Sequence, residues 1–113
     1  MEKLDQYKQI VRETLKEVAL MIPSMEGIEL QIVLDETNGH YLLFMVGWEN
    51  NRREYASIIH IDVKPDAKVH IQHDGTDLTV ALELVKKGIP KSSIVIAYRS
   101  PKQRIFIEEF AQA

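Results

Sequence analysis

The stretch REYASIIHIDVKPDAKVHIQH, residues 53–73, decides the fold, because two alternating apolar runs flank a short polar loop. The first run ends at Val63 and the second begins at Val69, with KPDAK between them. Alternation of apolar and polar residues is typical of strands with one buried face. Two such runs joined by a short, turn-like link predict an antiparallel hairpin.

The apolar residues also predict the register of this hairpin. Pairing Val63 with Val69 places Ile59 and Ile61 on the same face as Ile71. A slip by one residue would turn one strand's apolar side chains to the opposite face of the sheet, so the even register is favoured.

The same register assigns four polar side chains to the opposite face: His60, Asp62, His70 and Gln72. Asp62 then faces His70 directly across the two strands. His73 falls on the apolar side, at the end of the second strand. This hairpin is therefore expected to have one apolar face and one polar face rich in histidine.

The polar face has two interpretations. His60, Asp62 and His70 supply two imidazoles and a carboxylate, a competent ligand set for zinc or iron. A cross-strand Asp–His pair on a solvated face, however, needs no metal, and the sequence alone favours that structural interpretation. His40 lies too far along the chain to be assigned to the cluster.

Two further strands are expected before this hairpin. Residues 28–35 alternate strictly, and 36–39 contain the Asn-Gly turn signal. Residues 40–48, HYLLFMVGW, are almost continuously apolar, which predicts a central strand covered on both faces by helices or by another subunit. Residues 49–52 form the next turn, so the first four strands make an antiparallel meander.

One helix is expected before this meander in the sequence, and another after it. Residues 4–22 have an apolar stripe at helical spacing, and Pro23 ends the helix. The second helix follows the fourth strand, with Thr76 or Asp77 as its N-terminal cap and Gly88 as its stop. SIVIAY, residues 93–98, is the fifth strand.

These elements predict one α+β domain over residues 1–113: an N-terminal helix, an antiparallel sheet of about five strands, and a second helix between the fourth and fifth strands. The length of 113 residues suits a single core. No apolar run approaches the roughly 20 residues of a membrane span. Cysteine is absent, which excludes disulfides and thiolate zinc sites, and we expect a cytoplasmic protein without membrane attachment.

The sequence offers little support for an enzyme. It has no nucleophile elbow, phosphate-binding loop or dinucleotide-binding glycine pattern. We therefore expect no catalytic residue and no cofactor.

The charge is unevenly distributed. The net charge is −3, yet residues 86–104 contain six basic residues and no acidic one. Such a segment can dock nucleic acid or another anion, or it can simply be a solvated face. The candidate contacts are Lys87, Lys91, Arg99, Lys102 and Arg104.

Aromatic and arginine side chains mark a candidate protein interface. Trp48, Arg53 and Tyr55 surround the second turn, and Phe110 lies near the C-terminus. Tryptophan, tyrosine and arginine are over-represented among residues that dominate binding energy. The alternative is that Trp48 and Phe110 cover the edges of the core.

Five segments together resemble one family. YLLFMVGW, RREYASIIHIDV, VHIQHDGTD, ELVKKGIPKSSIVIAY and RSPKQR follow in the order and spacing of the XisI family, the fdxN-element excision controlling factors of cyanobacteria. The resemblance covers nearly the whole chain. Its most specific parts are the GW pair, the HIQHDGT-like turn and the GIPK junction.

The resemblance implies an accessory role in programmed excision of a DNA element during heterocyst differentiation. The implied partners are an XisH-like protein and a site-specific recombinase complex on DNA; a homodimer also stays open. The family supplies no catalytic residue. Two hypotheses follow: a non-enzymatic factor that acts by protein–protein interaction, or a direct nucleic-acid-binding protein or metal-dependent nuclease subunit.

Overall fold

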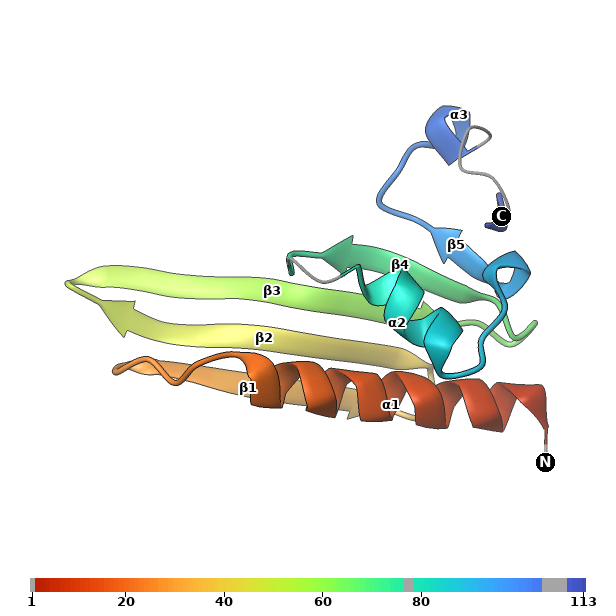
Figure 1. Cartoon of the computed structure of the whole chain (residues 1–113). Helices are drawn as coiled ribbons and strands as arrows, with labels where there is room; N and C mark the ends of the chain where they lie inside the picture. The colour runs from red at the N-terminus through yellow and green to blue at the C-terminus, as the bar shows by residue number, and fades with distance from the viewer. Residues whose placement is uncertain (1, 77–78, 105–109) are drawn as a thin grey trace.

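The structure, a computed structural model, describes residues 2–76, 79–104 and 110–113. The elements, in chain order, are α1 (Lys3–Met21), β1 (Ile28–Asp35), β2 (His40–Glu49), β3 (Arg52–Val63), β4 (Val69–Asp74), α2 (Val80–Lys86), the 3₁₀ turn η1 (Lys91–Ser93), β5 (Ile94–Ile96) and α3 (Pro101–Arg104). Among the described residues, no helix is long and apolar enough to cross a membrane. The predicted α+β domain is confirmed (Figure 1).

The five strands form one sheet in the order β1-β2-β3-β4-β5. The first four are antiparallel neighbours, which confirms the predicted meander. Short links, such as the two-residue turn at Asn50 and Asn51, permit this pairing, and both asparagines have positive φ angles.

The fifth strand differs from the predicted antiparallel pattern. β5 pairs with β4 in parallel and contains only Ile94–Ile96, within the predicted 93–98. Parallel neighbours require a crossover, and α2 provides it by carrying the chain back along the sheet. The sheet is therefore mixed, with one parallel pair at its edge.

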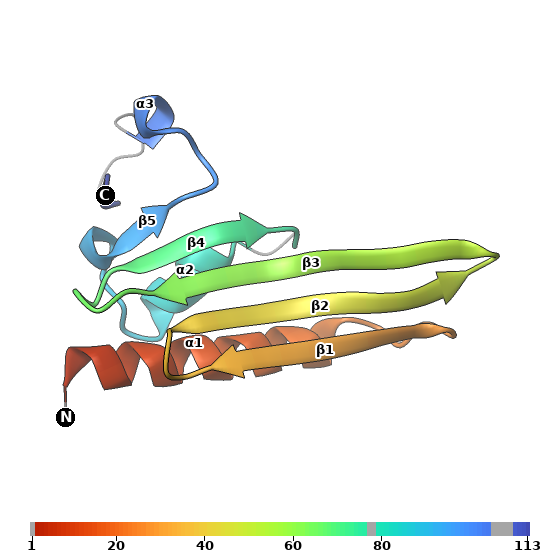
Figure 2. The same cartoon turned by 180° about the vertical axis from the view of Figure 1, so that it is seen from behind.

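Both main helices cover the same face of the sheet. α1 and α2 lie in front of the strands in Figure 1, and the view from behind in Figure 2 shows the other face uncovered by helices. The core between the layers is made of fully buried apolar side chains, the largest being Tyr41, Leu15, Leu43, Ile59, Ile61, Ile71, Leu84, Ile89 and Ile94. Their removal from water is the main stabilising contribution to the fold.

We call the face of the sheet that no helix covers the open face, and β2 contributes apolar side chains to it. β2 is an inner strand, as expected, but helices cover only one of its faces. Leu42, Phe44 and Val46 therefore remain partly exposed on the open face. Helices therefore cover one face of this strand rather than both, and the alternative that another subunit covers the open face stays a prediction.

The register of the β3–β4 hairpin is as predicted near its loop. Val63 pairs with Val69, and Asp62 pairs with His70. Beyond Ile61 the register shifts by one residue, so that His73 pairs with His60. His73 is exposed rather than on the apolar side, because the β-bulge changes the face to which the strand end points.

Asp74 performs the capping role expected of Thr76 or Asp77. Its Oδ2 accepts a hydrogen bond from the backbone N–H of Val80, the first residue of α2, at 3.0 Å. Its Oδ1 accepts bonds from the backbone N–H and the hydroxyl of Thr76. Thr79 rather than Thr76 occupies the N-cap position, and Asp77 lies outside the described residues. The carboxylate satisfies amides on both sides of the turn, which fixes the start of α2.

Candidate functional site on the open face

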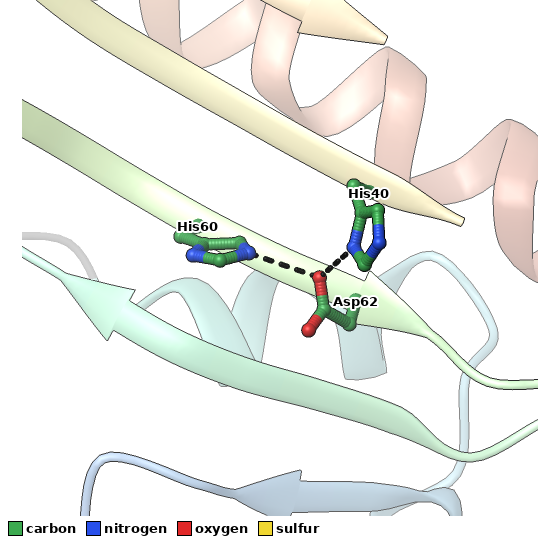
Figure 3. Close-up of side chains that lie close together, drawn as sticks. All are labelled: His40, His60 and Asp62. Carbon is green, nitrogen blue, oxygen red and sulfur yellow. Dashed lines mark hydrogen bonds and ion pairs between the residues drawn. The ribbon is translucent and has the colours of Figure 1, made fainter. Parts of the chain in front are cut away.

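Three polar side chains converge on the open face where β2 begins and β3 ends (Figure 3). The Nδ1 of His40 lies 2.7 Å from Oδ1 of Asp62, and the Nε2 of His60 lies 2.9 Å from the same oxygen. The three ligand atoms all lie within 4.8 Å of one another. We call this group the His–Asp–His cluster.

Asp62 is the centre of the cluster. Its side chain is only 8% exposed, whereas those of His40 and His60 are 47% and 33% exposed. Its second oxygen accepts a hydrogen bond from Gln72 Nε2 at 3.2 Å, and Lys64 Nζ lies 3.9 Å from that oxygen. The carboxylate is thus held in place on both oxygens.

The surroundings keep Asp62 ionised. Burial on its own would raise the pKa of this carboxyl group. Hydrogen bonds from His40 and His60 outweigh burial, and the pKa of Asp62 lies below its usual value. Asp62 therefore places a buried carboxylate charge within hydrogen-bond distance of two imidazoles.

The cluster contains two of the three residues predicted from the sequence. His60 and Asp62 are neighbours, but the third member is His40 rather than His70. His70 is half-buried on β4, and its pKa is lowered, first by burial and then by the charge of Lys64.

A second β-bulge explains why the sequence did not reveal His40. Counting back from the Asn50–Asn51 turn places His40 opposite Ile61, on the apolar face. In the structure Leu43 pairs with Ile59 and Phe44 with Ser57, so Ile58 is an extra residue in β3. This bulge moves His40 opposite Asp62. The sequence does contain one signal of this bulge. Polar residues of β3 occupy odd positions at Arg53 and Ser57 but even positions at His60 and Asp62.

The predicted interface residues on the second turn form a cluster at the other end of β2. The guanidinium carbon of Arg53 lies 5.4 Å from the ring centroid of Trp48 and 5.8 Å from that of Tyr55. The ring of Phe44 lies 5.4 Å from that of Tyr55. Trp48 and Tyr55 are 57% and 65% exposed. We call Phe44, Trp48, Arg53 and Tyr55 the hairpin cluster.

Phe110 does not join the hairpin cluster. It is partly buried against the core, and Lys91 Nζ lies 5.7 Å from its ring centroid. The next residue, Ala111, forms a bridge with Val95 of β5. In Figure 1 this C-terminal end lies far from the turn between β2 and β3.

The basic segment is partly engaged within the chain. Lys87 forms an ion pair of 2.6 Å with Glu17 of α1. Arg104 donates hydrogen bonds to the backbone carbonyls of Arg99, Gln112 and Ala97. Arg99 lies over the ring of Tyr98, and Lys102 is exposed. Lys91 Nζ lies near the ring of Phe110, so four of the five basic residues have a contact within the chain.

One apolar groove was not anticipated from the sequence. It lies on the helix-covered side, where α1 ends and the β2–β3 hairpin continues, and Ile22, Met45 and Ile58 contribute to its lining. Leu20 and Met21, the last two residues of α1, are also exposed. The chain thus has apolar surface on both sides of the projecting hairpin.

Known proteins resemble this chain in sequence and in structure. The sequence matches the XisI protein family over residues 1–112. No curated protein matches the chain. A solved XisI-like protein from Anabaena variabilis ATCC 29413 has 34% identity and a TM-score of 0.91, over 97% of this chain and 99% of that one.

A second solved structure is the fdxN element excision controlling factor XisI from the same organism. It has 26% identity and a TM-score of 0.86, over 99% of this chain and 100% of that one. The family match and the two structures include all five resembling segments and also the residues before Tyr41. The chain belongs to the XisI family.

Proposed function

We propose that this chain is a non-enzymatic controlling factor for the programmed excision of a DNA element, and that it acts by binding an XisH-like protein. Family membership and the name of the second Anabaena structure support an excision-control role. The cellular setting we propose is the cytoplasm of a cyanobacterium undergoing heterocyst differentiation, with the complex serving a site-specific recombinase.

The hairpin cluster is the observation that carries the partner hypothesis. Trp48 and Tyr55 expose more than half of their surface, although aromatic side chains of this size usually bury most of theirs. The guanidinium of Arg53 lies close to both rings, and this contact favours ordered positions for them. A preordered aromatic surface loses less entropy on binding, which favours its use as an interface.

The position of the hairpin cluster also suits a partner. The turn between β2 and β3 extends beyond α1 and β4 (Figure 2). Leu42 and Val46 are partly exposed, and they extend the apolar surface along β2 from Trp48 toward the His–Asp–His cluster. A partner lying along this strand would cover the face that the helices leave open.

Direct nucleic-acid binding has weaker support. The positive charges of Lys87 and Arg104 are used by Glu17 and by backbone carbonyls, respectively. Arg99 and Lys102 remain as exposed candidates for phosphate contact. Binding to DNA by these residues alone would be weak and strongly salt-dependent.

The first experiment is co-expression with the XisH-like protein, followed by size-exclusion chromatography with light scattering. We expect a stable complex whose affinity falls by about tenfold or more in Trp48→Ala and in Arg53→Ala, because such residues dominate interface energy. Leu82→Ala is the matched control, since Leu82 is an exposed apolar residue of α2 outside the hairpin cluster.

Three results would contradict this proposal. The chain and the XisH-like protein could fail to form a complex, or the complex could be insensitive to both hairpin substitutions. A homodimer of the isolated chain that is disrupted by Trp48→Ala would instead assign the hairpin cluster to self-association.

A further inference from the structure

We infer that the His–Asp–His cluster binds a divalent transition-metal ion of the zinc type. The inference goes beyond the partner role, and it departs from the expectation that the chain has no cofactor. The site consists of His40 from β2 and of His60 and Asp62 from β3 (Figure 3).

The geometry favours a single ion between the three side chains. Two imidazole nitrogens approach the same carboxylate oxygen, at 2.7 and 2.9 Å. The ring planes of His40 and His60 are inclined by 71°, with centroids 6.4 Å apart, so the rings converge rather than stack. Ligand atoms of a tetrahedral zinc ion are separated by about 3.3 Å, as its bond lengths of about 2.0–2.1 Å require. Small side-chain rotations would provide that spacing.

The donor set indicates the kind of ion. Neutral imidazoles with one carboxylate suit zinc, iron, nickel or copper, whereas magnesium and calcium prefer oxygen ligands. Three protein ligands leave a fourth position for water, as in zinc sites that are open to solvent. That position would lie on the exposed side, because both histidines are partly exposed and Asp62 is buried beneath them.

The residues around the cluster support Asp62 as a ligand. Gln72 holds the carboxylate oxygen that the histidines do not contact. Outer-shell hydrogen bonds of this kind orient ligands and strengthen metal binding. The ammonium of Lys64 lies 3.9 Å from the same oxygen, and its positive charge would repel a bound metal ion. It contacts the oxygen farther from the histidines and is partly exposed, so it can move into solvent when a metal binds.

Strand pairing gives the cluster its rigidity. His40 and Asp62 are paired across β2 and β3, while His60 and Asp62 are two residues apart on β3 and share one face. The three ligands therefore come from neighbouring positions in a regular ladder rather than from a loop. A site of this kind needs little reorganisation to bind an ion.

The test is titration of the metal-free protein with Zn²⁺ by isothermal calorimetry, together with metal analysis after dialysis. We expect one ion per chain, and a loss of affinity of about tenfold or more in His40→Ala and in His60→Ala. His73→Ala is the matched control, since His73 is an exposed histidine paired with His60 but outside the cluster. It should bind Zn²⁺ as the unchanged protein does.

The folding of each variant is checked by circular dichroism without metal. His40→Ala is the safer variant because His40 is the more exposed histidine, and His40→Gln provides a second one that preserves polarity. Absence of stoichiometric Zn²⁺ binding would overturn the inference. Binding that survives both His40→Ala and His60→Ala would also overturn it. So would a loss of affinity in His73→Ala as large as in the two cluster variants, because either result indicates unspecific contact with surface histidines.

Discussion

Gly47 precedes Trp48 because the chain leading into β1 passes directly over that position. Its φ angle is +156°, and a Cβ atom there would overlap the carbonyl oxygen of Gly27. Trp48 donates its backbone N–H to that same carbonyl, at 3.0 Å. The GW pair therefore combines close backbone approach with an exposed aromatic side chain.

Replacing Gly47 by alanine should be clearly destabilising. The new methyl group would force the two backbones apart in addition to straining φ, at a cost of about 3 kcal/mol. Gly88→Ala is the control, because Gly88 also has a positive φ, +115°, but a Cβ there would meet only Ile10 Cδ1 at 3.9 Å. That change should cost about 1 kcal/mol. Urea unfolding measures both, and equal losses would refute the role of backbone contact.

At the level of single residues, the sequence predicted that histidine and aspartate form a polar face, but it did not predict every residue that contributes to the cluster. Alternation correctly placed His60 and Asp62 on one polar face, since it depends only on the period of a strand. It could not place His40, because one extra residue, Ile58, shifts the pairing of a neighbouring strand. A bulge has no reliable sequence pattern, so the third member of the cluster emerged only from the structure.

The elements themselves were largely predictable. The β3–β4 register near its loop followed from apolar pairing, and the ends of α1 and α2, just before Pro23 and Gly88, followed from local backbone chemistry. The direction of β5 was not predictable from its own residues. Three buried apolar residues suit either direction, and the choice depends on how α2 carries the chain across the sheet.

The C-terminal element depends on Arg104. Its guanidinium donates to the carbonyls of Arg99 at 2.9 Å, Gln112 at 3.2 Å and Ala97 at 3.3 Å. One side chain thus connects α3, the segment after β5 and the residues near the C-terminus. This is a structural use of a residue that the sequence had suggested for nucleic-acid contact.

Arg104→Lys should therefore lower the free energy of unfolding by about 1–2 kcal/mol, because an ammonium cannot make all three bonds in the same geometry. Arg99→Lys preserves charge at an exposed position and should change stability by less than about 0.5 kcal/mol. Thermal unfolding of both variants distinguishes them, and equal stabilities would contradict the role of Arg104. DNA-binding experiments on Arg104 variants need this comparison to separate lost contact from lost structure.

For the whole molecule, the important division is between the two faces of the sheet. Helices bury one face and determine stability, whereas the open face has the His–Asp–His cluster and the hairpin cluster at opposite ends of β2. Composition and periodicity predicted the layered fold because burial leaves a strong pattern. They did not predict how the side chains of the open face are arranged, since exposed residues follow no such period.

The parallel pairing of β5 has a consequence for the order of folding. The links before β4 are short, residues 36–39, 50–51 and 64–68, but β4 and β5 are separated by residues 75–93. Short links cost less chain entropy to close, so the meander should form before β5 docks. Amide hydrogen exchange should then show the most slowly exchanging protons in β2 and β3, and faster exchange at Ala111, which bonds to Ile94.

During synthesis the same order means that β4 is an exposed edge strand until β5 has been made and pairs with it. An exposed edge can pair with another chain. The crossover that brings β5 to the sheet therefore also determines how long the edge of β4 stays open to pairing with another chain.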